Sequence, residues 1–137
     1  MMAMNSEKST QEKPTLSSKD KALFCARGAL EKKAGEITIL KIGPVSTIAE
    51  YFVICSGRSI RQTRAISDHL QMHCKKNGIH RPLGVEGEQE GSWILLDYDD
   101  VVVHIFLEPT RELYSLEKLW SEAPLLMDPE IQEALAM

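Results

Sequence analysis

The sequence predicts an α/β fold, in which helices pack on a mixed β-sheet within a single domain. Two long segments have apolar residues at helical spacing, and short apolar segments typical of strands lie between and after them. Two further apolar segments flank a short acidic turn, which indicates an antiparallel hairpin. This order of elements is typical of a sheet with helices packed on it, and 137 residues are enough for one domain with a substantial core.

Two long helices are predicted from capping residues and apolar spacing. The first covers residues 19–33 and is capped by Ser17 or Ser18. The second is capped by Ser59 and extends to about residue 77, where a glycine follows that can end a helix.

The strands and short helices are predicted from apolar runs and the turn residues around them. We expect strands at residues 37–42 and 51–55, and a short strand at 83–85. The second of these is expected to be central because it lacks polar residues. Short helical turns are expected at 111–114 and 116–120.

The predicted hairpin has strands at residues 93–96 and 101–107. The expected cross-strand pairs are Leu96–Val101, Leu95–Val102, Ile94–Val103 and Trp93–His104. Side chains alternate along a strand, so each strand contributes to two faces. One face is aliphatic and consists of Ile94, Leu96, Val101, Val103 and Ile105. The other is largely aromatic and consists of Trp93, Leu95, Val102, His104 and Phe106. Because neither face is polar, we expect helices or a partner to cover both.

The chain divides into three predicted parts. Residues 1–18 are polar, lack the apolar segment of a signal peptide and are expected to form a disordered tail. Residues 19–124 are expected to form the domain. Residues 125–137 form a C-terminal extension, in which Asp128-Pro129 could begin a last helix.

The composition excludes several classes of function. The net charge of −4 argues against nucleic acid as the main contact, and no apolar run approaches the ~20 residues that a membrane span needs. We therefore expect a cytoplasmic protein. Cys25, Cys55 and Cys74 form no spaced pair and are interpreted as reduced, mostly buried thiols.

Candidate chemical sites are weak. Asp97 and Asp99 could hold Mg²⁺ in a metal-dependent, nucleotidyltransferase-like enzyme, but aspartate is also favoured in turns for conformational reasons. His69 and His73 lie four residues apart on a predicted helix, without an evident third ligand. We expect no catalytic residue, no metal and no cofactor, and keep the enzyme as the alternative hypothesis.

A basic ridge is predicted on the second helix. Arg58, Arg61 and Arg64 lie three residues apart on its first turns, and such a ridge is usually a solvated face. The preceding Ser56-Gly57 turn could bind an anion at the helix N-terminus. A capped turn from strand to helix is the simpler interpretation.

Four segments carry a resemblance to a known family. They are AEYFVICSG at 49–57, SIRQTRAISDH at 59–69, WILLDYDDVVVHIF at 93–106 and RELYSLEKLW at 111–120. With Glu86-Gly87 between the second and third, they resemble the Iojap-like family of ribosomal silencing factors over about residues 19–124. The chain departs from the common family pattern at Glu50, often Asp, and at Asp99, often Gly.

The resemblance implies a fold related to nucleotidyltransferases without their activity. It implies a non-enzymatic translation repressor that binds the large ribosomal subunit through universal large-subunit ribosomal protein number fourteen. Binding there would block subunit joining and lower translation when nutrients are limiting. Family members can also self-associate, so a homodimeric scaffold that hides the same face is a further hypothesis.

We expect the partner to bind the aromatic face of the hairpin. Its predicted centre is Trp93, Leu95, His104 and Phe106, because interface anchors tend to be aromatic and central. Its predicted acidic rim is Tyr98, Asp99, Asp100 and Glu108, facing a basic ribosomal protein.

Overall fold

The structure is a computed structural model that describes residues 16–136. It contains a five-stranded sheet in the order β1-β2-β5-β4-β3. The strands are β1 (Gly35–Lys41), β2 (Tyr51–Gly57), β3 (Gly84–Glu86), β4 (Trp93–Asp97) and β5 (Val101–Leu107). Strands β2 and β5 are parallel and the other neighbours are antiparallel, which confirms the predicted mixed sheet.

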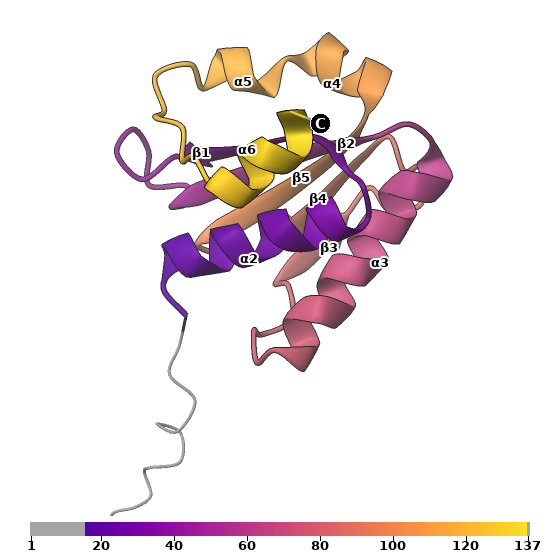
Figure 1. Cartoon of the computed structure of the whole chain (residues 1–137), viewed down its shortest axis with the longest axis horizontal. Coiled ribbons are helices and arrows are strands. Elements are labelled where there is room, and N and C mark those ends of the chain that lie inside the picture. The colour runs from indigo at the N-terminus through magenta and orange to yellow at the C-terminus, as the bar shows by residue number, and fades with distance from the viewer. Residues whose placement is uncertain (1–15, 137) are drawn as a thin grey trace, which may run out of the picture.

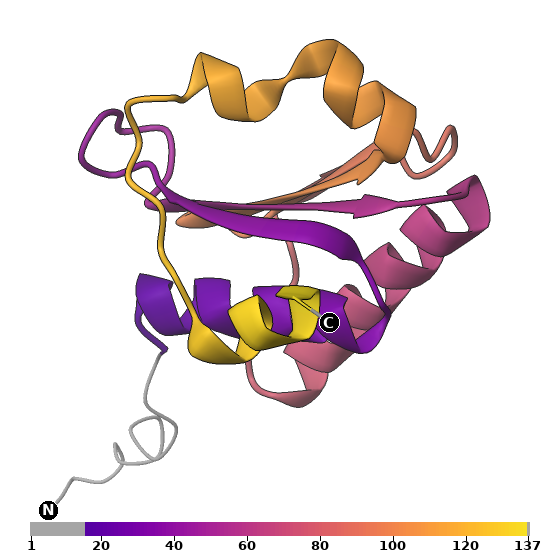
Figure 2. The same cartoon turned by 45° about the horizontal axis from the view of Figure 1, so that its top comes forward.

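Helices cover both faces of this sheet (Figures 1 and 2). One layer contains α2 (Ser18–Glu31), α3 (Ile60–Lys76) and α6 (Pro129–Ala136). The opposite layer contains the short α4 (Glu108–Tyr114) and α5 (Leu116–Leu119). No helix among residues 16–136 combines the length and apolar character needed to cross a membrane.

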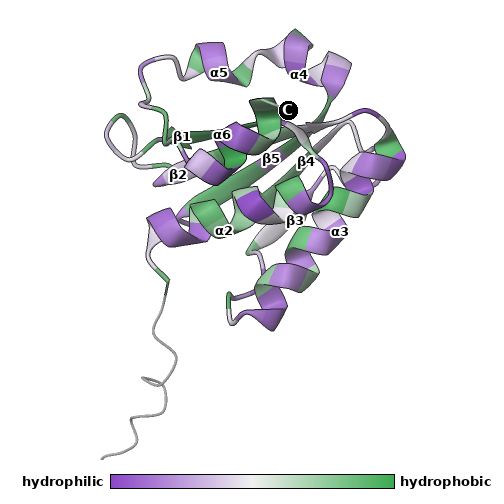
Figure 3. Cartoon of the chain, in the orientation of Figure 1, coloured by the Kyte–Doolittle hydropathy of each residue, from purple (hydrophilic) through white to green (hydrophobic). Residues whose placement is uncertain are grey.

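Two hydrophobic cores result, one on each side of the sheet. The α2–α3 core contains the aliphatic face of the hairpin, including Ile94, Leu96 and Val103, all fully buried. The α4–α5 core contains the aromatic face, with Phe106 fully buried and Trp93 packed at its margin. Figure 3 shows the apolar residues gathered on the sheet and on the inner sides of the helices. The predicted division of the hairpin into two faces is therefore confirmed.

The predicted helix caps are also confirmed. The Ser17 hydroxyl accepts a hydrogen bond from Asp20 N at 3.1 Å, and the Ser59 hydroxyl accepts one from Gln62 N at 3.1 Å. Gln62 Oε1 in turn accepts from Arg58 N at 2.8 Å. The side-chain oxygens of Ser59 and Gln62 therefore cap the start of α3, in agreement with the capped-turn interpretation. Most of the tail expected to be disordered lies outside the described residues.

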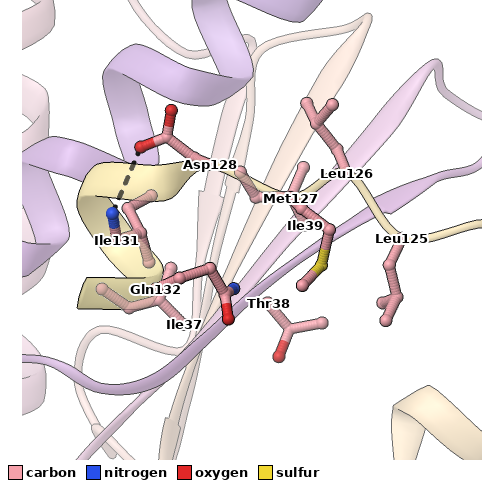
Figure 4. A pocket seen from close by; sticks show the side chains of 9 residues that line it. All are labelled: Ile37, Thr38, Ile39, Leu125, Leu126, Met127, Asp128, Ile131 and Gln132. Atoms are coloured by element: carbon pink, nitrogen blue, oxygen red, sulfur yellow. Dashed lines mark hydrogen bonds between the residues drawn. The ribbon is translucent and has the colours of Figure 1, made fainter. Parts of the chain in front are cut away.

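The C-terminal segment packs into the domain. Asp128 is buried, and its Oδ2 accepts from Ile131 N at 3.3 Å at the start of α6 (Figure 4). Its Oδ1 lies 2.6 Å from Nη2 of Arg27 on α2. Arg27 and this backbone bond hold the pKa of Asp128 below its usual value of 3.8. The possible last helix is thus present, and Ile131 anchors it in the α2–α3 core.

The three cysteines are free and buried, as predicted. Burial raises the pKa of the Cys55 thiol to about 12, so this thiol is protonated at neutral pH and unreactive. Cys25 of α2 and Cys74 of α3 approach each other to 3.9 Å between sulfur atoms in the same core.

The pairing register of the hairpin differs from the prediction by two residues. Leu96 lies opposite Val103 instead of Val101, and Trp93 lies opposite Phe106 instead of His104. The reason is that Tyr98 is fully buried in the α2–α3 core and pairs with Val101, so the chain turns at Asp99 and Asp100. A shift of two residues preserves the alternation of side chains, and the predicted faces survive.

The acidic turn has a conformational explanation. Asp97 Oδ1 accepts a hydrogen bond from Asp99 N at 2.8 Å, which is an Asx turn. Asp99 has a φ of +77°, in the left-handed region that favours glycine. Glycine at this position, the residue that the Iojap-like pattern often has there, would adopt this φ without strain.

We expect Asp99→Gly to stabilise the fold by about 1 kcal/mol, because it removes the cost of a left-handed non-glycine residue. The Asx bond should survive because it uses the Asp99 backbone. Urea unfolding measures the change, with Asp99→Ala as the control that keeps the strain. Equal or lower stability of the glycine variant would contradict the expected relief of strain.

Candidate functional site

Trp93 lies on the α4–α5 side of the sheet, close to α4. Its ring contacts Phe106 of β5 with centroids 4.8 Å apart and Tyr114 of α4 with centroids 5.0 Å apart. The indole is only partly buried, in contrast to Phe106. The Trp93 indole is therefore held in place by neighbouring aromatic rings and remains partly accessible to a partner.

His104 fixes the orientation of this indole. Its Nδ1 accepts a hydrogen bond from Trp93 Nε1 at 3.2 Å, so the ring proton of the neutral form is on Nε2. Nε2 is buried and has no hydrogen-bond partner among residues 16–136. The Phe52 ring packs edge-on against the His104 imidazole, with ring centroids 4.6 Å apart. Burial lowers the pKa of His104 to about 4, partly opposed by Glu117, so the ring is neutral at pH 7.

The α4–α5 layer follows directly from local sequence. Pro109 occupies the first turn of α4, where its missing N–H costs nothing. Ser115 has a left-handed conformation, with a φ of +46°, and separates α4 from α5. The two short helices therefore form a bent strap across the aromatic face, visible above the sheet in Figure 2.

A buried arginine holds this strap on the sheet. The guanidinium of Arg111 binds Glu117 Oε2 through Nε at 2.9 Å and Nη2 at 2.5 Å. It also donates to the hydroxyls of Ser56 at 2.7 Å and Thr38 at 3.3 Å. Arg111 therefore connects α4 to α5 and to strands β1 and β2, with its charge paired inside the protein.

The outer side of the strap and the edge of β4 expose apolar side chains. Leu113 is 77% exposed and Tyr114 is 56% exposed. Tyr114 and the partly exposed Trp93 and Leu95 form a surface that we name the Trp93 patch, and Leu113 adjoins Tyr114 along α4. An open groove beside it is lined by Trp93, Leu95 and Tyr114, and also by Glu86 and Glu90.

The surroundings of the Trp93 patch are acidic. Glu86 and Glu90 border it on the side of β3, and Glu108 and Glu112 are exposed on α4. Apolar anchors bordered by these carboxylates are suited to a protein partner with a positive charge.

Comparisons with known proteins identify the family. A family model described as "Ribosomal silencing factor during starvation" matches residues 15–136. The chain belongs to this ribosomal silencing factor family. The Iojap-like resemblance in the sequence is thereby confirmed, and the family supports a ribosome-silencing role.

Several relatives in the silencing factor family are similar over most of the domain. The Ribosomal silencing factor RsfS of Bacillus subtilis is 42% identical over 69% of this chain and 80% of its own length. The chloroplastic protein Iojap of Zea mays is 34% identical over 74% of this chain and 44% of its own length. The solved structure of a protein from Bacillus halodurans is 32% identical, with a TM-score of 0.71 over 80% of this chain and 99% of that one. A crystal structure from Chromobacterium violaceum gives a TM-score of 0.75 at 27% identity, over 77% of this chain and 88% of that one.

The structure of this silencing factor separates the predicted contact residues into three groups. Trp93 and Leu95 lie together in the Trp93 patch, with Glu108 exposed on the adjoining helix. His104 and Phe106 are on the predicted face but are only 4% and 0% exposed. They support the patch from beneath and do not reach its surface, because the strap covers them.

The three turn residues of the predicted rim need correction. Tyr98 is fully buried on the opposite side of the sheet, with burial raising its pKa, and is no rim residue. Asp100 is bound within the protein, to Lys21 Nζ at 2.7 Å and to the Ser18 hydroxyl at 2.6 Å. Asp99 is exposed, but it lies at the far end of the hairpin from Trp93, about 15–20 Å away at the usual rise of a strand.

Leu113 and Tyr114 are surface residues that the sequence did not predict. Both lie on a short helix that also contains the inward-facing Arg111. On a helix with 3.6 residues per turn, position 113 points away from the face that carries position 111, whereas position 114 lies near that face. The burial of a charged residue at 111 could not be inferred from the sequence, so the side of this helix that faces the sheet could not be predicted.

The predicted basic ridge is only partly on α3: Arg61 and Arg64 lie in its first turns, whereas Arg58 precedes the Ser59 cap. Arg64 donates to the carbonyls of Glu88 and Gln89 and so holds the loop between β3 and β4. Arg58 lies 4.0 Å from Glu108 and is 89% exposed. The ridge thus borders the acidic loop that flanks the Trp93 patch.

Proposed function

We propose that the chain binds the large ribosomal subunit by docking the Trp93 patch on universal large-subunit ribosomal protein number fourteen. The bound factor blocks joining of the small subunit and represses translation in the cytoplasm under nutrient limitation. Membership of the silencing factor family supports the ribosome as the target. The named partner follows from the resemblance to the Iojap-like family.

The observation that carries the docking proposal is the exposure of apolar residues within an acidic border. Aromatic side chains whose orientation is already fixed by packing lose little conformational freedom on binding and are frequent interface anchors. The orientation of Trp93 is fixed in this way, since His104 accepts a hydrogen bond from its indole and Phe106 packs against its ring. The carboxylates around it favour a basic ribosomal protein and raise the rate of association more than the affinity.

A steric block requires no chemistry. The domain is expected to have a radius of gyration of roughly 14 Å, from its length. A body of this size bound on the joining face would hold the two subunits farther apart than hydrogen-bonding distance. The proposal therefore assigns the chain the role of a repressor that acts by occupying a surface.

We expect Trp93→Ala to weaken binding to purified large subunits by about 2 kcal/mol or more, roughly thirtyfold in affinity. Co-sedimentation measures the affinity, and thermal unfolding verifies that the variant is folded. Met72→Ala is the matched control, because Met72 is 58% exposed on α3 in the opposite helical layer. It should bind like the unmodified protein.

Three results would contradict the proposal. Wild-type binding by a folded Trp93→Ala variant would show that the Trp93 patch is not the docking surface. Undiminished subunit joining in sucrose gradients, at saturating factor, would exclude the steric block. A homodimer that dissociates on Trp93→Ala without any change in ribosome binding would assign the patch to self-association.

A further inference from the structure

Three side chains with metal-binding atoms converge between α2 and α3, in the helical layer opposite the Trp93 patch. Glu31 is the last residue of α2, and His69 and His73 are one turn apart on α3. One ligand atom of each lies within 4.8 Å of the other two. His69 Nε2 is already 2.8 Å from Glu31 Oε1. The fold thus supplies the third ligand that was not evident in the sequence.

The two imidazoles are held in place by stacking. The imidazoles of His69 and His73 stack with ring centroids 5.2 Å apart and an angle of 14° between their planes. The Phe24 ring of α2 stacks on the His73 imidazole, with ring centroids 4.3 Å apart and an angle of 7° between their planes. Ligands that are already oriented lose little freedom when an ion binds, which favours affinity.

A glycine makes room for this arrangement. Gly28 lies inside α2, where glycine is unfavourable compared with alanine. A Cβ atom there would lie 3.2 Å from His73 Cδ2 and 2.7 Å from Leu70 Cδ2. The absence of a side chain at Gly28 therefore lets α3 approach and places His73 between the helices.

We propose that Glu31, His69 and His73 form a binding site for a divalent transition-metal ion of the Zn²⁺ class. Two imidazoles and one carboxylate suit Zn²⁺, whereas Mg²⁺ and Ca²⁺ prefer oxygen ligands only. Ligand bonds of about 2.0–2.2 Å require donor atoms roughly 3.4 Å apart. The Glu31 side chain is 56% exposed and can rotate to meet this spacing.

The site is open to the solvent. The His69 side chain is 25% exposed, so an ion can enter and a water molecule can complete its coordination. The ion would connect the C-terminal end of α2 to the middle of α3. Because the three ligands come together only in the folded chain, binding would stabilise the fold.

The test is titration of the full chain with Zn²⁺ in competition with a chromophoric chelator. We expect one equivalent to bind and the melting temperature to rise with Zn²⁺ concentration. His69→Gln should lower the affinity at least about tenfold, as expected for loss of a ligand. Glu31→Gln should lower it as well. His80→Gln is the matched control and should bind normally, because His80 lies outside this cluster.

The His69→Gln and Glu31→Gln variants together test where the ion binds. His69→Gln is preferred to a change at His73, which also packs against Phe24 and could disturb folding. Zn²⁺ binding that is equally tight in the folded His69→Gln and Glu31→Gln variants would place the ion elsewhere, for example on Cys25 and Cys74, and overturn the proposal. Absence of binding at millimolar Zn²⁺ would overturn it too.

Discussion

Arg111→Ala is expected to lower the free energy of unfolding by about 2–3 kcal/mol, because the buried guanidinium makes charge-assisted hydrogen bonds to a carboxylate that is itself 34% exposed. The change leaves the Glu117 carboxylate without its two hydrogen bonds and removes the donor to the Ser56 hydroxyl. The strap of α4 and α5 would lose its connection to β1 and β2. Since the strap carries Leu113 and Tyr114, ribosome binding should weaken together with stability.

Urea unfolding measures this effect, and Arg58→Ala is the control. The Arg58 side chain is 89% exposed, and its contact with Glu108 is 4.0 Å long, so its loss should cost less than about 1 kcal/mol. Similar losses for the two variants would contradict the importance of burial at Arg111. A stable Arg111→Ala protein that no longer binds ribosomes would instead indicate that Arg111 acts on the surface.

The second large effect concerns acid stability through His104. Its pKa is 6.5 in the unfolded chain and about 4 in the folded protein, where burial disfavours the imidazolium. Between these values the unfolded state binds the extra proton, so stability falls as the pH drops from about 6.5 to 4. The total loss from this group is about 3 kcal/mol, from the size of the shift.

Unfolding free energies measured at steps from pH 7 to pH 4 test this expectation. His104→Gln should reduce the slope in this window, since glutamine does not titrate. Asp100 and Asp128, whose pKa values are lowered by Lys21 and Arg27 among other partners, lose their contributions only below about pH 4. An unchanged slope in His104→Gln would show that His104 does not cause the acid sensitivity.

Much of the fold could be predicted because it depends on local patterns. The caps at Ser17 and Ser59 were predictable, since a hydroxyl that accepts a backbone N–H acts within one turn of helix. The two faces of the hairpin were also predictable, because successive side chains along a strand point to opposite sides of the sheet. The register was not, since it depended on whether Tyr98 joins the core, which its neighbours in sequence do not decide.

The candidate site was predicted in part. Trp93 and Leu95 lie on an accessible surface, as expected from the aromatic face. His104 and Phe106 share that face but are buried, because a buried arginine fastens α4 and α5 over them. Nothing near residue 111 in the sequence indicates that its guanidinium finds Ser56, 55 residues away.

The sequence by itself therefore determined the elements of this protein, their caps, the two faces of the hairpin and the family. These features depend on contacts within a turn, on side-chain alternation and on motifs that remain readable along the chain. Only the tertiary structure decided which aromatic side chains reach the surface and where the acidic groups gather around them. It also decided that Glu31 meets His69 and His73 across 38 and 42 residues of chain. Exposure and convergence depend on the packing of distant elements, and the spacing of residues along one chain does not encode that packing in readable form.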